Sequence, residues 1–160
     1  MRKRKQPRGQ GNLTHLVIHL QQQNKLTVDQ VSSILRASDI RITDADVQQY
    51  LNVDSSSYKR NLVLDTDSVQ LLVLCWKPGQ GSKIHDHGAS NCGIRVLCGN
   101  ADETLYGGTV EEPVELSTRQ HGEGNVTAND GMLIHQVANR SGGLLVTLHL
   151  YSPPLIRMNG

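Results

Sequence analysis

Gly79-Gln-Gly-Ser-Lys-Ile-His85-Asp-His87-Gly-Ala-Ser-Asn-Cys92-Gly-Ile-Arg-Val-Leu-Cys-Gly99 is the most informative stretch of this 160-residue chain. Side chains two residues apart in a β-strand project to the same face, so His85 and His87 can reach one interior point. Two neutral imidazoles at this spacing are suitable ligands for a divalent metal ion. A His-X-His pair alone is common, and the framing glycines Gly79 and Gly99 make the pattern more specific.

The spacing resembles the first motif of the cupin superfamily, in which a glycine and five further residues precede His-X-His and a second glycine follows. Cupins usually carry a glutamate ligand five residues after the second histidine, and here that position holds Cys92. The odd spacing from His87 would point Cys92 to the opposite face of a regular strand. A bend or bulge at Gly88 or Gly93 is therefore expected if Cys92 faces the metal.

The charge of the chain is unevenly distributed. The formal net charge is +1, but residues 1–10 carry five of the 16 basic side chains and none of the 15 acidic ones, which leaves 11 bases against 15 acids in the body. We expect residues 1–11 to be a disordered basic tail and residues 12–160 to form a single domain with its own core. The acidic body, with 3% aromatic residues, argues against nucleic-acid binding.

The cysteine content and the hydropathy pattern indicate the cellular compartment of the protein. Three cysteines, an odd number, without an apolar signal-peptide region indicate a reducing environment, and we predict a cytoplasmic protein. No apolar run approaches the length that spans a membrane, so no membrane partner is expected. We also expect a monomer.

Residues 12–51 carry helical signals and are predicted to form a small N-terminal helical cap. Leucine and valine side chains recur at helical spacing after Asn12, a suitable N-cap. Thr27-Val-Asp-Gln30 has the form of a capping box and begins a second helix, and Thr43-Asp-Ala-Asp46 is expected to cap a third, short one.

From residue 58 onward the pattern changes to strands separated by polar and glycine-rich turns, without helical crossovers. The expected strands are Tyr58–Asp65, Val69–Trp76, Ser90–Leu97, Asp102–Tyr106, Val114–Leu116, Met132–Asn139 and Leu144–Tyr151. This order predicts a mainly β fold, a cupin jelly-roll β-barrel over residues 58–154.

Among the other histidines, His135 is the preferred third metal ligand. It lies on an apolar strand, where a histidine bonded to a backbone carbonyl is the usual alternative, and Asn139 follows four residues later as in the second cupin motif. His15 and His19 lie four apart on the first helix and could hold a metal together, but they have no third ligand and are interpreted as surface residues. His121, in a glycine-rich loop, is expected to be exposed.

Several segments taken together resemble the cysteine dioxygenase family of thiol dioxygenases. They are Tyr58-Lys-Arg-Asn-Leu62, Cys75-Trp76, Gly81-Ser-Lys-Ile-His-Asp-His87, Ser90-Asn-Cys92, Gly99-Asn100, Glu103-Thr-Leu105 and His149-Leu-Tyr-Ser-Pro-Pro154. The resemblance runs from about residue 13 to Pro154. The family commonly continues past the two prolines with another hairpin over the site, and in a chain that ends at Gly160 we expect that cover to be short or missing.

The resemblance implies an iron enzyme that oxidises a small thiol. It implies Fe(II) held by His85, His87 and His135, with L-cysteine bound through sulfur and amine, and both atoms of dioxygen added to the thiol to give cysteine sulfinic acid. It also implies that Arg60 binds the substrate carboxylate, supported by Tyr58. Without the family, Arg60 would be interpreted as a surface arginine of an edge strand.

Near the C-terminus, the resemblance implies that His149 bonds to the hydroxyl of Tyr151 beside iron and sulfur. A buried Tyr–His pair that only closes the barrel is the alternative. Cys92 and Tyr151 correspond to a thioether crosslink found in animal-type members, whereas Cys75 and Cys98 are expected to be small core residues.

Two other functions remain open on the sequence. The chain could oxidise a thiol without the amine, such as 3-mercaptopropionate, although such relatives usually carry glutamine in place of Arg60. It could also be a non-catalytic cupin that binds zinc or a small ligand, because three histidines suit zinc as well. The presence of His149 and Tyr151 argues against a pure binding protein.

Overall fold

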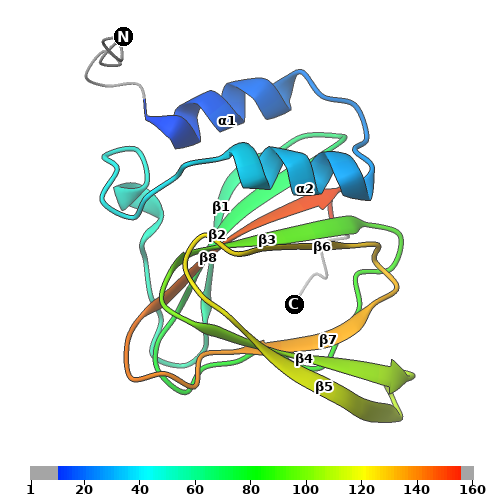
Figure 1. Ribbon diagram of the computed structural model, residues 1–160. Helices are drawn as coiled ribbons and strands as arrows, with labels where there is room; N and C mark the ends of the chain where they lie inside the picture. The colour runs from blue at the N-terminus through cyan, green and yellow to red at the C-terminus, as the bar shows by residue number, and fades with distance from the viewer. Residues whose placement is uncertain (1–10, 156–160) are drawn as a thin grey trace, which may run out of the picture.

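The computed structural model describes residues 11–155, which form two β-sheets with two helices on one side (Figure 1). The elements are α1 (Asn12–Gln21), α2 (Val28–Ala37), the 3-10 helix η1 (Gln48–Tyr50), β1 (Lys59–Asp65), β2 (Gln70–Trp76), β3 (Asn91–Cys98), β4 (Ala101–Gly108), β5 (Pro113–His121), β6 (Val126–Asn129), β7 (Ile134–Ala138) and β8 (Leu145–Ser152). One sheet has the order β1-β2-β8-β3-β6 and the other β5-β4-β7, and all neighbours are antiparallel. The predicted jelly-roll fold is confirmed. The predicted basic tail lies outside the described residues, apart from Gly11.

Two hydrophobic cores explain why β2 and β8 are buried along their whole length. One core lies beneath the helices and includes Leu71 and Leu148. The other lies between the sheets and includes Leu72 and Tyr151. Successive residues of these strands therefore face different cores, which gives them continuous apolar character in place of alternation.

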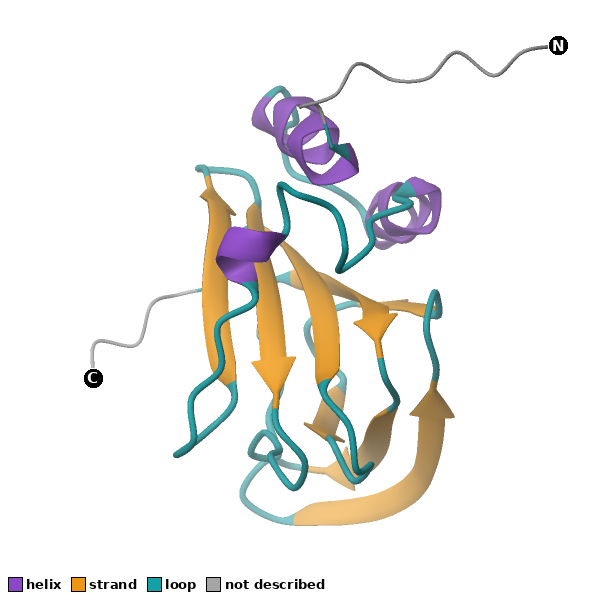
Figure 2. Cartoon of the chain, turned by 90° about the vertical axis from the view of Figure 1, so that its left-hand side faces the viewer, coloured by secondary structure: helices purple, strands orange, loops and turns teal. Residues whose placement is uncertain are grey.

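The helices pack on the outer face of the five-stranded sheet, where α2 contacts β3, β6 and β8 (Figures 1 and 2). The predicted capping box of α2 is present, because Thr27 accepts from the Gln30 amide and the Gln30 side chain accepts from the Thr27 amide. The prediction of Asn12 as N-cap is wrong, because α1 begins at Asn12 itself. Asp46 provides the cap from a distance, since its carboxylate accepts from both the amide and the hydroxyl of Thr14, each at 2.9 Å.

The predicted third helix is also wrong in extent. Residues 42–47 form turns, and only Gln48–Tyr50 are helical, as a single 3-10 turn. Asp44 accepts from the Arg41 amide and Asp46 is engaged with α1, so both acidic residues stabilise turns and a neighbouring helix. Neither helix in the described range 11–155 has the length and apolar character needed to cross a membrane.

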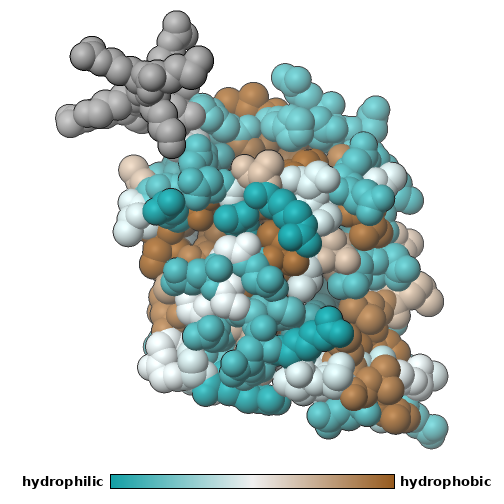
Figure 3. Space-filling model, viewed as in Figure 1, coloured by the Kyte–Doolittle hydropathy of each residue, from teal (hydrophilic) through white to brown (hydrophobic). Residues whose placement is uncertain are grey.

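Strands β4 and β5 extend beyond their predicted limits, and β6 was not predicted. β5 runs over nine residues, Pro113–His121, and is exposed until its last residue. Val114 and Leu116 are 58% and 67% exposed there. Hydrophobic side chains accordingly show on the surface over the projecting ends of β4 and β5 (Figure 3).

Candidate metal centre

Two histidines that are neighbours in the sequence, His85 and His87, meet His135 from a distant part of the chain between the two sheets. The backbones of His85 and His135 exchange two hydrogen bonds, of 3.0 and 2.9 Å, in an isolated antiparallel bridge. The rings of His85, His87 and His135 form a triangle with centroid distances of 4.7 to 5.1 Å. One nitrogen from each ring lies within 4.8 Å of the others, so the predicted set of three residues converges. His85 and His87 lie on an extended segment beside β7 and outside the regular strands.

Hydrogen bonds on the far side of two of these rings leave a nitrogen available on the inner side. His135 Nδ1 lies 2.8 Å from Glu103 Oε2, and its Nε2 is buried without a hydrogen-bond partner. His85 Nδ1 lies 2.6 Å from the Lys83 carbonyl oxygen. A buried imidazole nitrogen without a partner is costly unless a ligand occupies it, so the residues fit a divalent metal ion.

The charge state of the rings also suits metal binding. Burial, followed by the nearby charges of His85, His135 and Arg60, lowers the pKa of His87 to about 3. Burial likewise lowers the pKa of His85, although the hydrogen bond to Lys83 opposes this. Both rings are therefore neutral at pH 7 and offer lone pairs.

Glu103 on β4 supports the centre from outside. Its side chain is 7% exposed and accepts from His135 through Oε2 and from His121 through Oε1, at 2.8 and 3.0 Å. Burial raises the pKa of the Glu103 carboxyl, but the hydrogen bonds and charges of His135 and His121 outweigh it, so the net pKa lies below the usual value. No role was predicted for Glu103 from the sequence, although an acidic residue within a predicted strand is a signal that can be noticed.

The prediction that His121 is exposed is wrong. It is the last residue of β5, its side chain is 13% exposed, and its Nε2 contacts Glu103. Asn125, in the following loop, places its Nδ2 2.6 Å from His121 Nδ1. The glycine-rich sequence after His121 forms the turn that brings Asn125 back to it.

A second chain of hydrogen bonds runs along β8 on the face toward the other sheet. Thr147 Oγ1 lies 2.7 Å from His149 Nε2, and His149 Nδ1 lies 3.0 Å from the Tyr151 hydroxyl. Burial lowers the pKa of His149 well below its usual value and raises that of Tyr151, so both groups are neutral at pH 7. The Tyr151 and His87 ring centroids are 5.3 Å apart, which places this chain beside the three histidines. Thr147 was not singled out in the sequence.

Cys92 and Tyr151 are direct cross-strand partners on β3 and β8. Both side chains are buried in the core between the sheets. The expected bend lies at Gly88, whose φ is +58°, in the turn between His87 and β3. Gly93 lies in regular pairing with both neighbouring strands and does not form the bend. Burial raises the pKa of Cys92 to about 12, so the thiol is protonated.

Arg60 and Tyr58 lie on the β1 side of the same space. The charge of Arg60 contributes to the lowered pKa values of His85, His87 and His149, so its guanidinium lies near all three. Arg60 itself is exposed. The Tyr58 ring stacks on Trp76 with a centroid distance of 4.2 Å.

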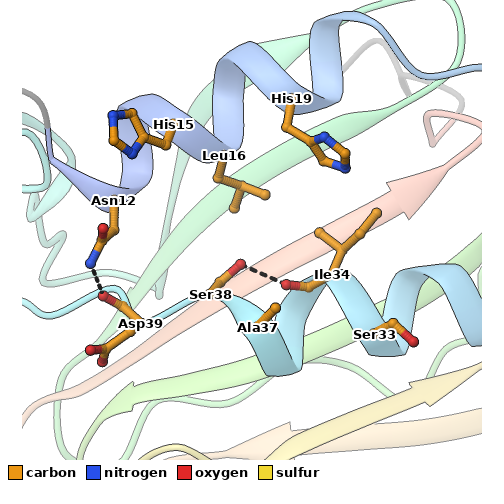
Figure 4. A pocket seen from close by; sticks show the side chains of 9 residues that line it. All are labelled: Asn12, His15, Leu16, His19, Ser33, Ile34, Ala37, Ser38 and Asp39. Atoms are coloured by element: carbon orange, nitrogen blue, oxygen red, sulfur yellow. Dashed lines mark hydrogen bonds between the residues drawn. The ribbon is translucent and has the colours of Figure 1, made fainter. Parts of the chain in front are cut away.

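The other predicted histidine pair is separate from this centre. Figure 4 shows His15 and His19 on α1, along a groove that Ile34 and Ala37 of α2 line from the other side. Both histidines are exposed. Among residues 11–155, the one cluster of three potential metal ligands is that of His85, His87 and His135.

Comparisons with known proteins agree with this geometry. A family model for cysteine dioxygenase type I matches residues 2–160. Human cysteine dioxygenase type 1 is 35% identical over 154 residues, which cover 92% of this chain and 76% of the human protein. A Klebsiella pneumoniae protein with a double-stranded β-helix domain superposes with a TM-score of 0.57 at 19% identity, covering 72% of this chain and 91% of that one. An RmlC-like cupin from Methanocaldococcus jannaschii superposes with a TM-score of 0.52 at 16% identity, covering 64% and 85%. These two structures identify the fold as a cupin.

Proposed function

Because the chain belongs to the cysteine dioxygenase type I family and is a thiol dioxygenase, we propose that it uses Fe(II) to convert L-cysteine to cysteine sulfinic acid. The observation that supports a metal most strongly is the buried Nε2 of His135, which has no hydrogen-bond partner and lies on the side of the ring opposite Glu103. In the proposed reaction the S–H and O=O bonds break, two S–O bonds form and the thiol proton passes to a sulfinic acid oxygen, so all atoms of the thiol and of dioxygen remain in the product acid.

The three histidines would hold the iron as a set of neutral ligands. A ligand set without a carboxylate leaves the metal its full positive charge, which favours binding of an anionic thiolate. Iron, when bound, would supply the redox chemistry that brings dioxygen and the thiol together. Zinc binding is the runner-up for the same three ligands, and the metal content of the purified protein distinguishes the two.

Arg60 is the proposed residue for the substrate carboxylate. Its guanidinium is exposed and close enough to affect the pKa values of the inner histidines. A guanidinium pairs with a carboxylate through two parallel hydrogen bonds, which also fixes the orientation of the substrate. Tyr58, held against Trp76, is proposed to support this end of the site.

Tyr151 is the proposed proton donor on the other side. If Thr147 donates to His149 Nε2, then His149 Nδ1 donates to the Tyr151 oxygen, and the Tyr151 hydroxyl proton is directed elsewhere. The raised pKa of Tyr151 keeps this proton in place at pH 7. We propose that the hydroxyl donates to the oxygen atoms that are transferred to sulfur, and that a thioether between Cys92 and Tyr151 holds the ring in position.

The remaining assignments are also proposals. We propose that residues 12–160 form one domain in a cytoplasmic monomer, and the odd number of cysteines, three, supports a reducing compartment. The alternative substrate is 3-mercaptopropionate, which keeps the carboxylate for Arg60 but lacks the amine.

The proposed metal site is tested by replacing His135 with alanine. His135→Ala should lose bound iron and the oxygen consumption that cysteine induces, while the circular dichroism of the strands is retained, because the hydrophobic cores do not depend on a metal. The matched control is His19→Ala on the surface of α1. A His135→Ala protein that still binds one equivalent of iron would refute the proposed ligand set.

A further inference from the structure

One carboxylate serves two histidines next to the candidate metal centre. Glu103 Oε2 is 2.8 Å from His135 Nδ1 and Glu103 Oε1 is 3.0 Å from His121 Nε2. The three residues come from β7, β4 and β5, so the contacts cross the whole three-stranded sheet. None of the three side chains is more than 13% exposed, so water offers these polar atoms little alternative.

The direction of each hydrogen bond follows from Asn125, which bonds to His121 on the side away from Glu103. The Asn125 amide nitrogen donates to His121 Nδ1, at 2.6 Å, so the proton of a neutral His121 is on Nε2. This N–H donates to Glu103, whose other oxygen accepts from His135 Nδ1–H. His135 is then the tautomer with a lone pair on Nε2, which is the buried atom without a partner.

We infer that His121 is a positioning residue for the metal centre, which acts through Glu103 to fix the orientation and tautomer of the His135 ring. This inference rests on the metal site proposed above. A carboxylate with one partner could rotate and leave a buried oxygen unpaired, whereas two charge-assisted hydrogen bonds hold both oxygens. Groups that orient a metal-bound histidine in this way strengthen metal binding.

The alternative is that His121 only attaches the end of β5 to the barrel. Both roles predict a loss of thermal stability when His121 is replaced, so stability does not separate them. Metal affinity does, because only a positioning role changes the binding of an ion that His121 does not touch.

The test measures Co²⁺ affinity of the metal-free protein by competition with a chromophoric chelator. His121→Leu should weaken binding roughly tenfold, the lower end of the effect of a residue that orients a metal ligand. The matched control His19→Leu replaces an exposed histidine on α1 and should bind Co²⁺ like the wild type. In a Glu103→Gln background, His121→Leu should cause little further loss, because its effect passes through Glu103.

Each outcome decides a separate point. Wild-type protein that does not bind Co²⁺ refutes the metal site itself, and the inference with it. If the wild type binds Co²⁺ and folded His121→Leu binds it equally well, the inference alone is overturned. The inference is also overturned if His121→Leu weakens Co²⁺ binding as much in the Glu103→Gln background as in the wild type. If His121→Leu does not fold, Asn125→Ala removes the outermost hydrogen bond and His121→Gln retains an N–H donor. The inference is supported if Asn125→Ala binds Co²⁺ more weakly than the wild type and His121→Gln retains part of the wild-type Co²⁺ affinity. It is overturned if Asn125→Ala binds Co²⁺ with wild-type affinity.

Discussion

Cys92 of β3 lies directly opposite Tyr151 of β8, and both side chains are buried in the core between the sheets. Cβ atoms of directly opposed residues in an antiparallel pair are about 4.5–5.5 Å apart, within reach of a bond between a sulfur and a ring carbon after a small rotation of the side chains. This relationship arises because the turn at Gly88 lies between His87 and β3, so the odd spacing of Cys92 from His87 has no consequence for its direction.

The first prediction is the thioether between these two residues. Sγ of Cys92 and a ring carbon of Tyr151 each lose a hydrogen atom, and dioxygen accepts the two electrons and two protons. We expect the crosslinked protein, which is lighter by two hydrogen atoms, to be detected by intact mass only after turnover with iron, cysteine and dioxygen. Peptide mapping should then show the peptides of Cys92 and Tyr151 joined. Cys92→Gly should lack this species and retain part of the activity. Unmodified residues after extensive turnover would contradict the prediction.

Close packing of α2 on β3 gives a second prediction, at Gly93. A Cβ added there would lie 2.5 Å from Val31 Cγ1 and 2.7 Å from Leu35 Cδ1. Gly93→Ala should therefore lower the free energy of unfolding by about 1–3 kcal/mol, as overpacking does. Gly142→Ala is the matched control, because nothing lies within 4 Å of its added Cβ. Equal denaturation midpoints for the two variants would show that the helix adjusts freely.

The fold and the three metal-binding candidates were predictable because their signals are local. His85 and His87 are two residues apart, and His135 lies within an apolar strand of clear pattern. Glu103 and His121 were not assigned because their contacts join residues 32 and 18 positions apart through strand register, which the sequence pattern does not specify.

Local signals also failed where tertiary contacts dominate. Asp46 has the position of an N-cap for its own segment, yet its carboxylate caps α1, 32 residues away from it along the chain. The four residues of β6, Val126–Asn129, are too few to show a periodic pattern and are ordered by pairing with β3.

The third prediction concerns the pH dependence of stability, through His149. Its folded-state pKa lies well below the usual value because the neutral ring is buried between Thr147 and Tyr151. The unfolded chain therefore binds a proton that the folded one does not, once the pH falls below about 6.5. The free energy of unfolding of the metal-free protein should therefore decrease as the pH is lowered below this value, by about 1.4 kcal/mol per pH unit for this one group.

Urea denaturation at pH 7, 6 and 5 measures this slope. His149→Gln keeps an amide in the same place without a titrating ring. The dependence of its free energy of unfolding on pH should therefore be shallower than that of the wild type by about 1.4 kcal/mol per pH unit. His19→Gln on the surface of α1 serves as the matched variant. Identical slopes for wild type and His149→Gln would show that His149 takes up a proton over the same pH range in the folded and the unfolded chain, which contradicts the prediction.

Substrate recognition by Arg60 gives the fourth prediction. Arg60→Ala should weaken the binding of L-cysteine by roughly 1.5–3 kcal/mol, the contribution of hydrogen bonds to a charged group. Cysteamine, which has no carboxylate, should bind to both proteins alike, and 3-mercaptopropionate should lose as much as cysteine. Anaerobic titration of the iron-loaded protein measures all three. Equal losses for cysteine and cysteamine would assign Arg60 a structural role.

The most direct test of the account is isotope labelling of the product. Iron-loaded enzyme, L-cysteine and ¹⁸O₂ in unlabelled water should give cysteine sulfinic acid in which both sulfinate oxygens carry the label, with one molecule of dioxygen consumed per product formed. A product with one labelled oxygen or none, or a protein that binds iron and cysteine but consumes no dioxygen, would contradict the proposed dioxygenase.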